Sequence, residues 1–243
     1  MSHNDRRGFL AATAGLGLVA IAPGVHLMQV AQAQSQRAAG QPATKRQRWG
    51  MLIDTTKCAK GCDVCVSACA TENGINETVA DPRQASQWIR KIDIKDPQSG
   101  RQYSLPMMCQ HCAEPPCVDV CPTGASMKRA DGIVLVDRHI CIGCRYCMMA
   151  CPYKARSFVH QPLTQQNPEV PRGIGCVESC TLCVQRIDRG RLPACVEACP
   201  EKAMLFGDLE DPNSEIVRRA ASAATTQVRA DLKLNTGVRY QGI

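Results

Sequence analysis

Aromatic residues are scarce in this chain of 243 residues, which has three Phe, two Trp and four Tyr. Large aromatic side chains supply much of the buried area of an ordinary protein core, so a chain this poor in them needs another source of stability. The sequence also lacks a nucleophile paired with a base, a phosphate-binding loop and a paired-carboxylate site. We therefore expect no catalytic site of its own for chemistry on an organic substrate.

Long hydrophobic runs are absent as well. The longest stretch, FLAATAGLGLVAIA at residues 9–22, is shorter than the roughly 20 residues needed to span a bilayer. It follows Arg6-Arg7 and precedes Ala31-Gln32-Ala33, the order of a charged start, an apolar run and a small-x-small cleavage site. The paired arginines followed by Phe-Leu predict a twin-arginine signal at residues 1–33 and a periplasmic location. Cleavage after Ala33 and retention as a tether both stay open.

Two common uses of cysteine find no support. A c-type haem requires Cys-x-x-Cys-His, and neither Cys109–Cys112 nor Cys144–Cys147 is followed by His. The 17 cysteines are an odd number, which does not suit a framework of disulfides alone. Zinc takes two separated pairs of ligands, a pattern that only the most widely spaced cysteine group of this chain could satisfy.

What the sequence does contain is a compact run, Cys141-x2-Cys144-x2-Cys147-x3-Cys151-Pro152. This is the spacing of bacterial ferredoxins, in which three thiolates on one loop bind a [4Fe–4S] cluster and the fourth reaches a neighbouring cluster. We expect the fourth cysteine to begin a helix with proline at its first position, where the missing N–H costs nothing.

Three further groups of four cysteines repeat this pattern. They are Cys58-x3-Cys62-x2-Cys65-x3-Cys69, Cys109-x2-Cys112-x4-Cys117-x3-Cys121-Pro122 and Cys180-x2-Cys183-x11-Cys195-x3-Cys199-Pro200. Sixteen ligands predict four [4Fe–4S] clusters. The first group opens with x3 and lacks the proline, so a [3Fe–4S] cluster is the alternative for one of the four. Cys176 is left over; a spare ligand, a reactive thiol and an inert buried residue are the alternatives, of which we expect the last. His111 is expected to be partly exposed.

The formal net charge of +7 would by itself suggest binding to nucleic acid. Each oxidised cubane with four thiolates carries about −2, so four of them bring about −8. Residues 34–243 carry +6, because Asp5, Arg6 and Arg7 together contribute +1. The basic excess thus compensates for buried cluster charge, and we expect no nucleic-acid partner.

The segments between the cysteine groups predict an α+β protein. Strands are expected at residues 49–53, 88–96, 133–137 and 204–209, a turn at 96–100, a basic hairpin at 184–194 and a possible edge strand at the C-terminus. The predicted organisation is a signal peptide at 1–33, a linker at 34–47, a first ferredoxin motif plus insert at 48–107, an inner two-cluster module at 108–155, an insert plus fourth motif at 156–210, and a helical and strand tail at 211–243.

The four groups, with HCAEPPC and DGIVLVD, resemble the four-cluster iron–sulfur subunits of membrane oxidoreductases over residues 48 to 210. That family includes the electron-transfer subunits of dimethyl sulfoxide and polysulfide reductases and the NrfC type of formate-dependent nitrite reduction. The export signal, the Cys58-x3-Cys62 spacing and the tail RADLKLNTGVRYQGI resemble most closely the DsrO type, the periplasmic subunit of DsrMKJOP complexes of sulfur and sulfite metabolism.

The resemblance implies two interleaved ferredoxin-like modules, an outer one from groups one and four and an inner one from groups two and three. It implies that each group gives its fourth cysteine to the partner group. The implied ligand sets are Cys58, Cys62, Cys65 and Cys199; Cys180, Cys183, Cys195 and Cys69; Cys109, Cys112, Cys117 and Cys151; and Cys141, Cys144, Cys147 and Cys121. The inner clusters are then expected to be relays, with partners docking at groups one and four.

By the same resemblance, single electrons pass between a quinone-reactive NrfD/DsrP-like membrane subunit and another redox protein, for which a multihaem c-type cytochrome is a candidate. The chain is then membrane-associated through its partner. One alternative is the electron-transfer subunit of a molybdopterin reductase or of an NrfC-type nitrite reduction system. An alternative of another class is a zinc- or disulfide-stabilised binding protein.

Overall fold

The computed structural model of the protein describes residues 18–22, 25–28, 42–75, 79, 81–164 and 166–243. The chain divides into two units, Met1–Arg37 and Ala38–Ile243. Among the described residues, every helix is too short or too polar to cross a membrane.

The first unit contains one antiparallel pair of strands, β1 (Leu18–Ala22) and β2 (Val25–Met28). The paired arginines at positions 6 and 7 and the cleavage site expected at residues 31–33 lie outside the described residues. The export signal therefore stays a prediction from the sequence.

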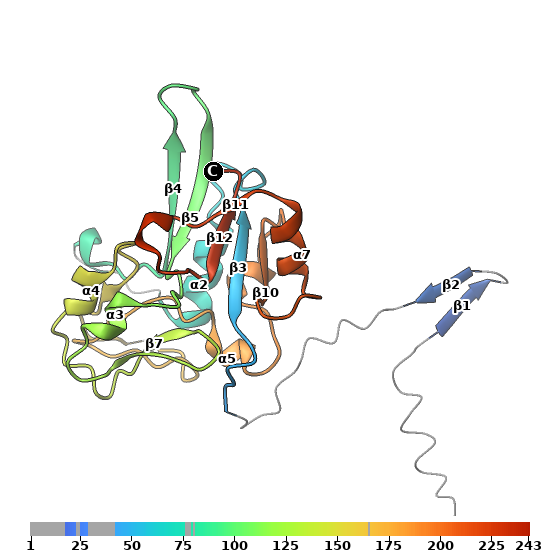
Figure 1. Cartoon of the computed structure of the whole chain (residues 1–243). Helices are drawn as coiled ribbons and strands as arrows, with labels where there is room; N and C mark the ends of the chain where they lie inside the picture. The colour runs from blue at the N-terminus through green and yellow to red at the C-terminus, as the bar shows by residue number, and fades with distance from the viewer. Residues whose placement is uncertain (1–17, 23–24, 29–41, 76–78, 80, 165) are drawn as a thin grey trace, which may run out of the picture. The chain divides into compact units, whose positions relative to one another are not determined.

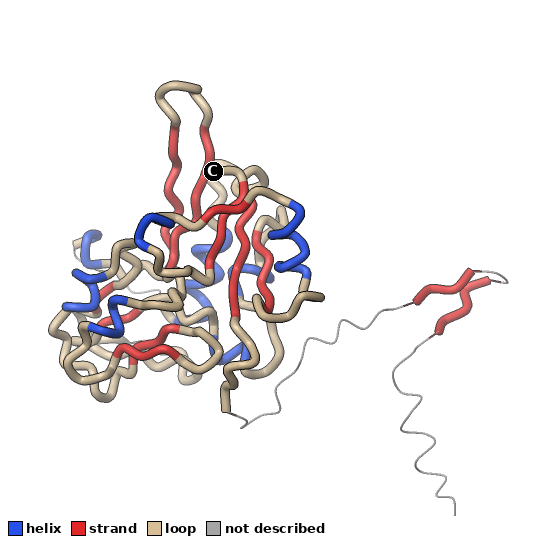
Figure 2. Tube along the Cα trace, viewed as in Figure 1, coloured by secondary structure: helices blue, strands red, loops and turns tan. Residues whose placement is uncertain are grey.

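The second unit consists of short helices and strands joined by long loops, which is the α+β content that the sequence predicts (Figures 1 and 2). Its helices are α2 (Val64–Asn73), α3 (Pro116–Asp119), α4 (Tyr146–Ala150), α5 (Val184–Ile187), α6 (Ala194–Glu197) and α7 (Glu215–Ser222). Its strands are β3 (Trp49–Asp54), β4 (Ile89–Lys95), β5 (Gln102–Met108), β6 (Ser126–Lys128), β7 (Val134–Val136), β8 (Ser157–Phe158), β9 (Val177–Glu178), β10 (Met204–Asp208), β11 (Thr225–Thr226) and β12 (Val238–Gln241).

A four-stranded sheet in the order β10-β3-β12-β11 joins the two ends of this unit. Strand β3 pairs antiparallel with β10 and parallel with β12, and Met51, Ile53 and Tyr240 on these strands are fully buried. The strands predicted after the linker and after group four are confirmed as β3 and β10. The prediction of an edge strand at the C-terminus was wrong, because β11 covers the free side of β12.

The C-terminal tail also holds the loop of the second cysteine group. The Tyr240 hydroxyl donates a hydrogen bond to the carbonyl of Pro106 at 2.9 Å and accepts one from the Gln110 side chain at 3.2 Å. The backbone N–H of Gly237 donates to the carbonyl of Gln110 at 2.9 Å. The tail is therefore part of the fold and connects the four-stranded sheet to the residues around Cys109.

Three hairpins complete the strand pairing: β4 with β5, β6 with β7 and β8 with β9. The β4–β5 hairpin projects from the body of the unit in Figure 1. The turn predicted at residues 96–100 is confirmed: Asp96 donates its N–H to the carbonyl of Arg101 at 2.8 Å, and Gly100 has a φ of 70°, which glycine adopts without steric cost.

The basic hairpin expected at residues 184–194 is not formed. This segment contains α5, then a turn, then the start of α6, and the N–H of Ile187 donates to the carbonyl of Cys183 at 3.0 Å. Arg186 is the physical reason, because its buried guanidinium reaches back to the carbonyl of Leu192 at 2.7 Å and to Glu72 on α2 at 2.9 Å. These contacts compact the segment against α2.

A buried ion pair joins the insert before group four to helix α2. Arg172 and Glu178 form two parallel hydrogen bonds of 2.9 and 2.7 Å, and their side chains are 1% and 4% exposed. Arg172 also donates to the carbonyl of Gly74, the C-cap of α2, at 2.8 Å. The insert, expected to be a surface loop, is thus partly buried.

Replacing Arg172 by Met leaves the Glu178 carboxylate buried without its partner. We expect this change to lower the free energy of unfolding by about 3–5 kcal/mol, measured from urea unfolding followed by circular dichroism. The matched control is Arg189→Met, which removes the exposed pair with Glu169 and is expected to leave the transition unchanged. Equal transitions for the two variants would contradict a structural role of the buried pair.

Candidate iron–sulfur sites

The four cysteine groups share one local structure. In each group the third cysteine is the second residue of a short helix: Cys65 in α2, Cys117 in α3, Cys147 in α4 and Cys195 in α6. The expectation that Cys-Pro begins a helix was wrong, because the cysteine before each proline follows the end of the helix. The residue before proline is disfavoured from helical geometry, and Cys151, with a ψ of 112°, ends α4 accordingly.

The loop before each of these helices has a second common feature. The residue that precedes the second cysteine has a positive φ in every group: 77° at Gly61, 43° at His111, 70° at Gly143 and 54° at Leu182. A positive φ reverses the backbone and turns successive N–H groups toward one side. Group one keeps this turn despite its extra residue, so its unusual x3 spacing does not change the conformation before the second cysteine.

Two sets of four cysteines line cavities. Site 1 is defined by Cys58, Cys62, Cys65 and Cys199, which line one cavity together with Pro200 and Met204. Site 3 is defined by Cys109, Cys112, Cys117 and Cys151, which line another together with Val134 and Tyr153. In both sites the fourth cysteine comes from a different sequence group than the first three.

In the other two implied sets, cysteines of different groups also interact. Site 2 is defined by Cys180, Cys183, Cys195 and Cys69; the Asn73 amide lies 3.5 Å from the sulfur of Cys69 and 4.0 Å from that of Cys183. Repulsion from Cys69, Cys195 and Cys183 adds to burial in raising the pKa of Cys180. Site 4 is defined by Cys141, Cys144, Cys147 and Cys121, of which Cys121 and Cys141 interact electrostatically with Cys147.

Electrostatic interactions and contacts link the four sites in the order 1, 2, 3 and 4. Cys65 of site 1 interacts electrostatically with Cys195 of site 2, and Cys109 of site 3 with Cys180 of site 2. Arg156 links site 3 to site 4, since it contacts Cys117 and also Ser126, whose N–H donates to Cys121. This order differs from the order of the groups along the sequence.

Burial dominates the chemistry of these thiols. It raises the pKa of Cys65 and Cys117 to about 11, and that of Cys69 and Cys112 to about 12. A thiol must lose its proton to bind a metal, so metal binding here releases protons and contributes to folding. Without a bound cation the protein interior favours the neutral thiols.

Some thiols receive hydrogen bonds that favour the thiolate. The backbone N–H of Ser126 donates to Cys121 at 3.3 Å, and that of Ala203 donates to Cys199 at 3.3 Å. Burial raises the pKa of Cys121, but the hydrogen bonds from Ser126 and Thr123 outweigh it and leave the pKa below its usual value. The chain therefore offers preformed N–H donors to the fourth cysteine of two groups.

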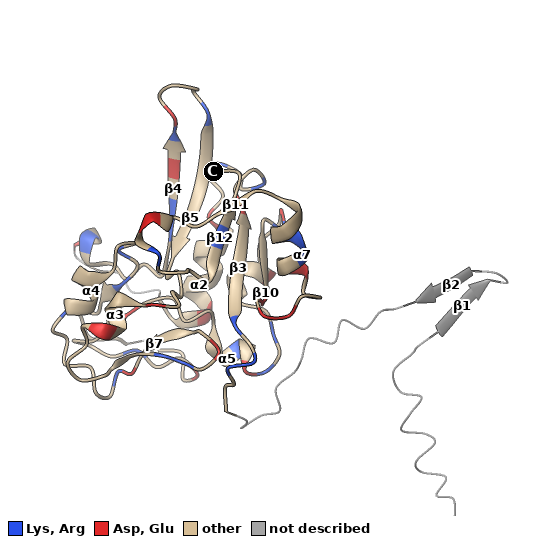
Figure 3. Cartoon of the chain, in the orientation of Figure 1, with Lys and Arg blue, Asp and Glu red and all other residues tan. Residues whose placement is uncertain are grey.

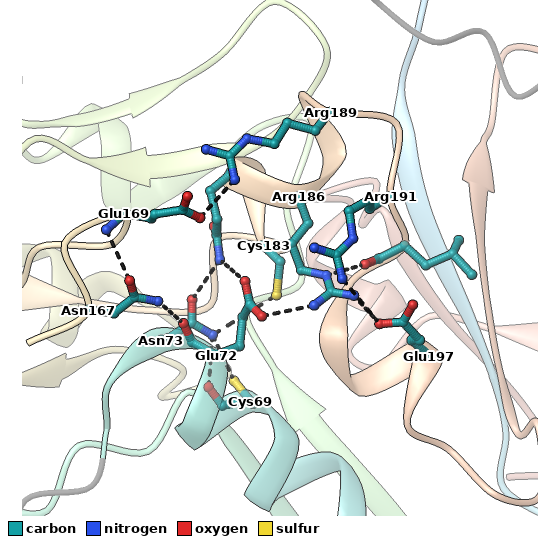
Figure 4. A network of polar contacts seen from close by, with 12 residues as sticks. Cys69, Glu72, Asn73, Asn167, Glu169, Cys183, Arg186, Arg189, Arg191 and Glu197 are labelled. Atoms are coloured by element: carbon teal, nitrogen blue, oxygen red, sulfur yellow. Dashed lines mark hydrogen bonds and ion pairs between the residues drawn. The ribbon is translucent and has the colours of Figure 1, made fainter.

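The missing proline after Cys69 has a structural consequence. Because Ala70 allows the helix to continue, α2 extends to Asn73, whose amide donates to the carbonyl of Cys69 at 2.9 Å and points toward its sulfur. Figure 4 shows Asn73 at the centre of a polar network beside site 2, with Arg186 placed between Glu72 and Glu197. Sequence reasoning missed Asn73, although Ala in place of Pro was the available signal.

Two predictions about individual residues have opposite outcomes. His111 is 2% exposed, so the expected partial exposure was wrong; its Nδ1 accepts the N–H of Val134 at 3.0 Å, and burial lowers its pKa to about 3. Cys176 is buried, as predicted, and its thiol points toward the carbonyl of Arg138 at 3.4 Å.

Exposure also differs from expectation. Among the described residues, Cys144 is the one exposed cysteine, and Ile142, Tyr146 and Met149 around it are 68%, 58% and 74% exposed. The sequence predicted that the exposed ends of the cluster chain, where partners dock, would lie at groups one and four. Site 4, built mainly from group three, is instead the most accessible of the sites.

The donor chemistry fits an iron–sulfur cluster. All 17 cysteines are free of disulfide bonds. In sites 1 and 3 four thiols line one cavity, and a multi-iron cluster has thiolates at its corners.

Comparison with known proteins agrees with this chemistry. The 4Fe-4S dicluster domain matches residues 101–209. The chain is 42% identical over 226 residues to the Hdr-like menaquinol oxidoreductase iron-sulfur subunit 1 of Archaeoglobus fulgidus, covering 81% of this chain and 84% of that protein. The chain belongs to the family of [4Fe–4S] electron-transfer subunits of membrane oxidoreductases.

Other members of the family are also similar. Protein NrfC of Escherichia coli is 42% identical over 176 residues, covering 70% of this chain and 69% of that protein. The arsenate respiratory reductase iron-sulfur subunit ArrB of Shewanella sp. is 37% identical over 205 residues, covering 70% and 85%. As a member of this family the chain carries [4Fe–4S] clusters and takes part in electron transfer.

The positive-φ glycines allow a test of the loop geometry. A Cβ at Gly143 would lie 2.3 Å from the carbonyl oxygen of Gly175, whereas a Cβ at Gly61 would have no atom within 4 Å. Gly143→Ala is therefore expected to lower the iron content, and Gly61→Ala to keep it while costing about 1–2 kcal/mol of stability from its left-handed backbone. Iron analysis and unfolding of both variants make the measurement, and equal iron loss would contradict the steric argument.

Proposed function

We propose that this chain binds four [4Fe–4S] clusters at sites 1 to 4 and relays single electrons along them in that order. The clusters, when bound, accept and release one electron at a time. The observation that supports the relay is the linked succession of thiol sets: Cys65 interacts electrostatically with Cys195 and Cys109 with Cys180, and Arg156 links sites 3 and 4. The cysteines of sites 2 and 3 are all buried, which keeps solvent away from these two sites.

In this proposal the two modules are interleaved. Sites 1 and 2 form the outer module, from groups one and four, and sites 3 and 4 form the inner module, from groups two and three. The pairing of β3 with β10 and the interaction of Cys65 with Cys195 support the first assignment. The shared contact of Arg156 supports the second.

We further propose that the chain is the periplasmic subunit of a DsrMKJOP-like complex, exported by the twin-arginine route. Its electrons would pass between an NrfD/DsrP-like membrane subunit that reacts with quinone and another redox protein such as a multihaem cytochrome. Arg6-Arg7 on this chain and its C-terminal tail support the assignment. The alternative is the corresponding subunit of a molybdopterin reductase, which the similarity to the iron-sulfur subunit ArrB of a respiratory reductase favours.

Pairs of cysteine substitutions test the proposed exchange of ligands. We expect about 16 iron per chain, four for each site, and a loss of about four on replacing either Cys58 or Cys199 by Ser. Because both belong to site 1, the double variant should lose no more than either single variant. Cys180→Ser with Cys199→Ser, which affects two sites although both residues belong to group four, should lose about twice as much.

Iron analysis and electron paramagnetic resonance of anaerobically purified protein make this measurement. Cys176→Ser is the matched control and is expected to keep the full iron content. The exchange of ligands would be ruled out by the opposite result: no further iron loss when Cys180 and Cys199 are replaced together, and twice the loss when Cys58 and Cys199 are. Zinc without a reducible signal would overturn the relay itself.

Purification from native membranes tests the complex. We expect an integral membrane subunit and a haem protein to co-purify with this chain, identified by mass spectrometry and by haem absorption. A molybdopterin-containing subunit in the same complex would instead establish the alternative. The control is a preparation from cells that lack this chain.

A further inference from the structure

Arg156 is a buried arginine outside every predicted cysteine group. It follows Ala155 in the segment between α4 and β8 and is 6% exposed. Its Nη2 donates to the sulfur of Cys117 at 3.1 Å and to the hydroxyl of Ser126 at 2.8 Å. One side of the guanidinium is thus fixed against a thiol of site 3.

The same guanidinium acts on site 4. Its hydrogen-bond partner Ser126 donates its backbone N–H to the sulfur of Cys121, a residue of site 4, at 3.3 Å. A single buried cation therefore contacts a thiol of site 3 directly and is linked to a thiol of site 4 through Ser126.

Arg156 differs from the other buried arginines in its lack of a carboxylate partner. Arg172 is paired with Glu178, and Arg186 with Glu72 and Glu197. In the part of the chain that the structure describes, Arg156 forms no ion pair with Asp or Glu, and its buried Nη1 makes no hydrogen bond of normal geometry. Figure 3 shows acidic and basic residues interspersed along the ribbon.

A buried cation without a counter-charge is strongly unfavourable. The groups facing Arg156 are thiols, which become anions only when they bind metal. The negative charge that stabilises this arginine must therefore come from loaded sites 3 and 4, and Nη1 is the donor left to meet it. Nearby charge and hydrogen bonds to sulfur are among the factors that set the reduction potential of such clusters.

We propose that Arg156 is a shared electrostatic bridge that raises the reduction potentials of the clusters at sites 3 and 4 together. The positive charge stabilises the reduced, more negative state on either side. It also reduces the repulsion that an electron at one site exerts on its neighbour. This inference rests on the ligand sets proposed above. It assigns to Arg156, which is not a ligand, an effect on the reduction potentials of two clusters.

The test is a redox titration of the intact, iron-loaded chain followed by electron paramagnetic resonance. In Arg156→Met we expect two of the four midpoint potentials to shift to lower values and two to stay. Arg156→Lys keeps the charge but loses the fork of N–H donors, so its two shifts should have the same sign and be smaller. Arg189→Met, which removes an exposed arginine, is the control and should shift none.

Unchanged potentials in Arg156→Met at full iron content would overturn the proposal, as would a shift at one site alone. If Arg156→Met does not load, Arg156→Lys decides, since it must still shift two potentials downward. The number of clusters and the iron content test the proposed relay separately. A chain with four reducible clusters and no response to Arg156 would keep the relay and reject the bridge.

Discussion

The burial of thiols is the constraint on which the rest of this structure depends. Burial raises the pKa of Cys180 and Cys195 well above the usual value, so the interior tolerates these groups as neutral thiols or as ligands of a cationic centre. Iron thus takes the place of the large aromatic core that the chain lacks, and cluster insertion and folding become one process. The shortness of α3, α4 and α6 follows from this, because each has only to place a cysteine in its first turn.

The grouping of cysteines from distant segments couples the two ends of the chain. Cys199 lies with three cysteines more than 100 residues earlier, and β3 lies between β10 and β12. The C-terminal tail then contacts the loop of Cys109 and Cys112. Loss of one segment therefore disturbs sites formed mainly by another, which is how a chain of short elements can fold cooperatively.

The surroundings of the sites are not equivalent. Lys91 on β4 donates to the carbonyl of Cys62 beside site 1. Arg186, the cation next to site 2, is instead neutralised by Glu72 and Glu197. Site 4 adjoins a surface with exposed apolar side chains such as Ile142. Hydrogen bonds, charge and exposure are the properties that separate the potentials of chemically identical clusters, so this asymmetry gives the chain a physical basis for directing electrons.

The sequence by itself determined the chemistry and the repeated local unit, because a cluster imposes a short-range spacing that is visible in Cys141 to Cys151. It also predicted β3, β10 and the turn at residues 96–100. Only the tertiary structure decided the interior position of β12, the burial of His111, the exposure of Cys144 and the position of Arg156 between two sites. These depend on contacts between residues far apart in the chain, which neither spacing nor local propensity records. The sequence shows that proline is missing after Cys69. That the longer helix brings the Asn73 amide close to Cys183 could be seen only in the tertiary structure.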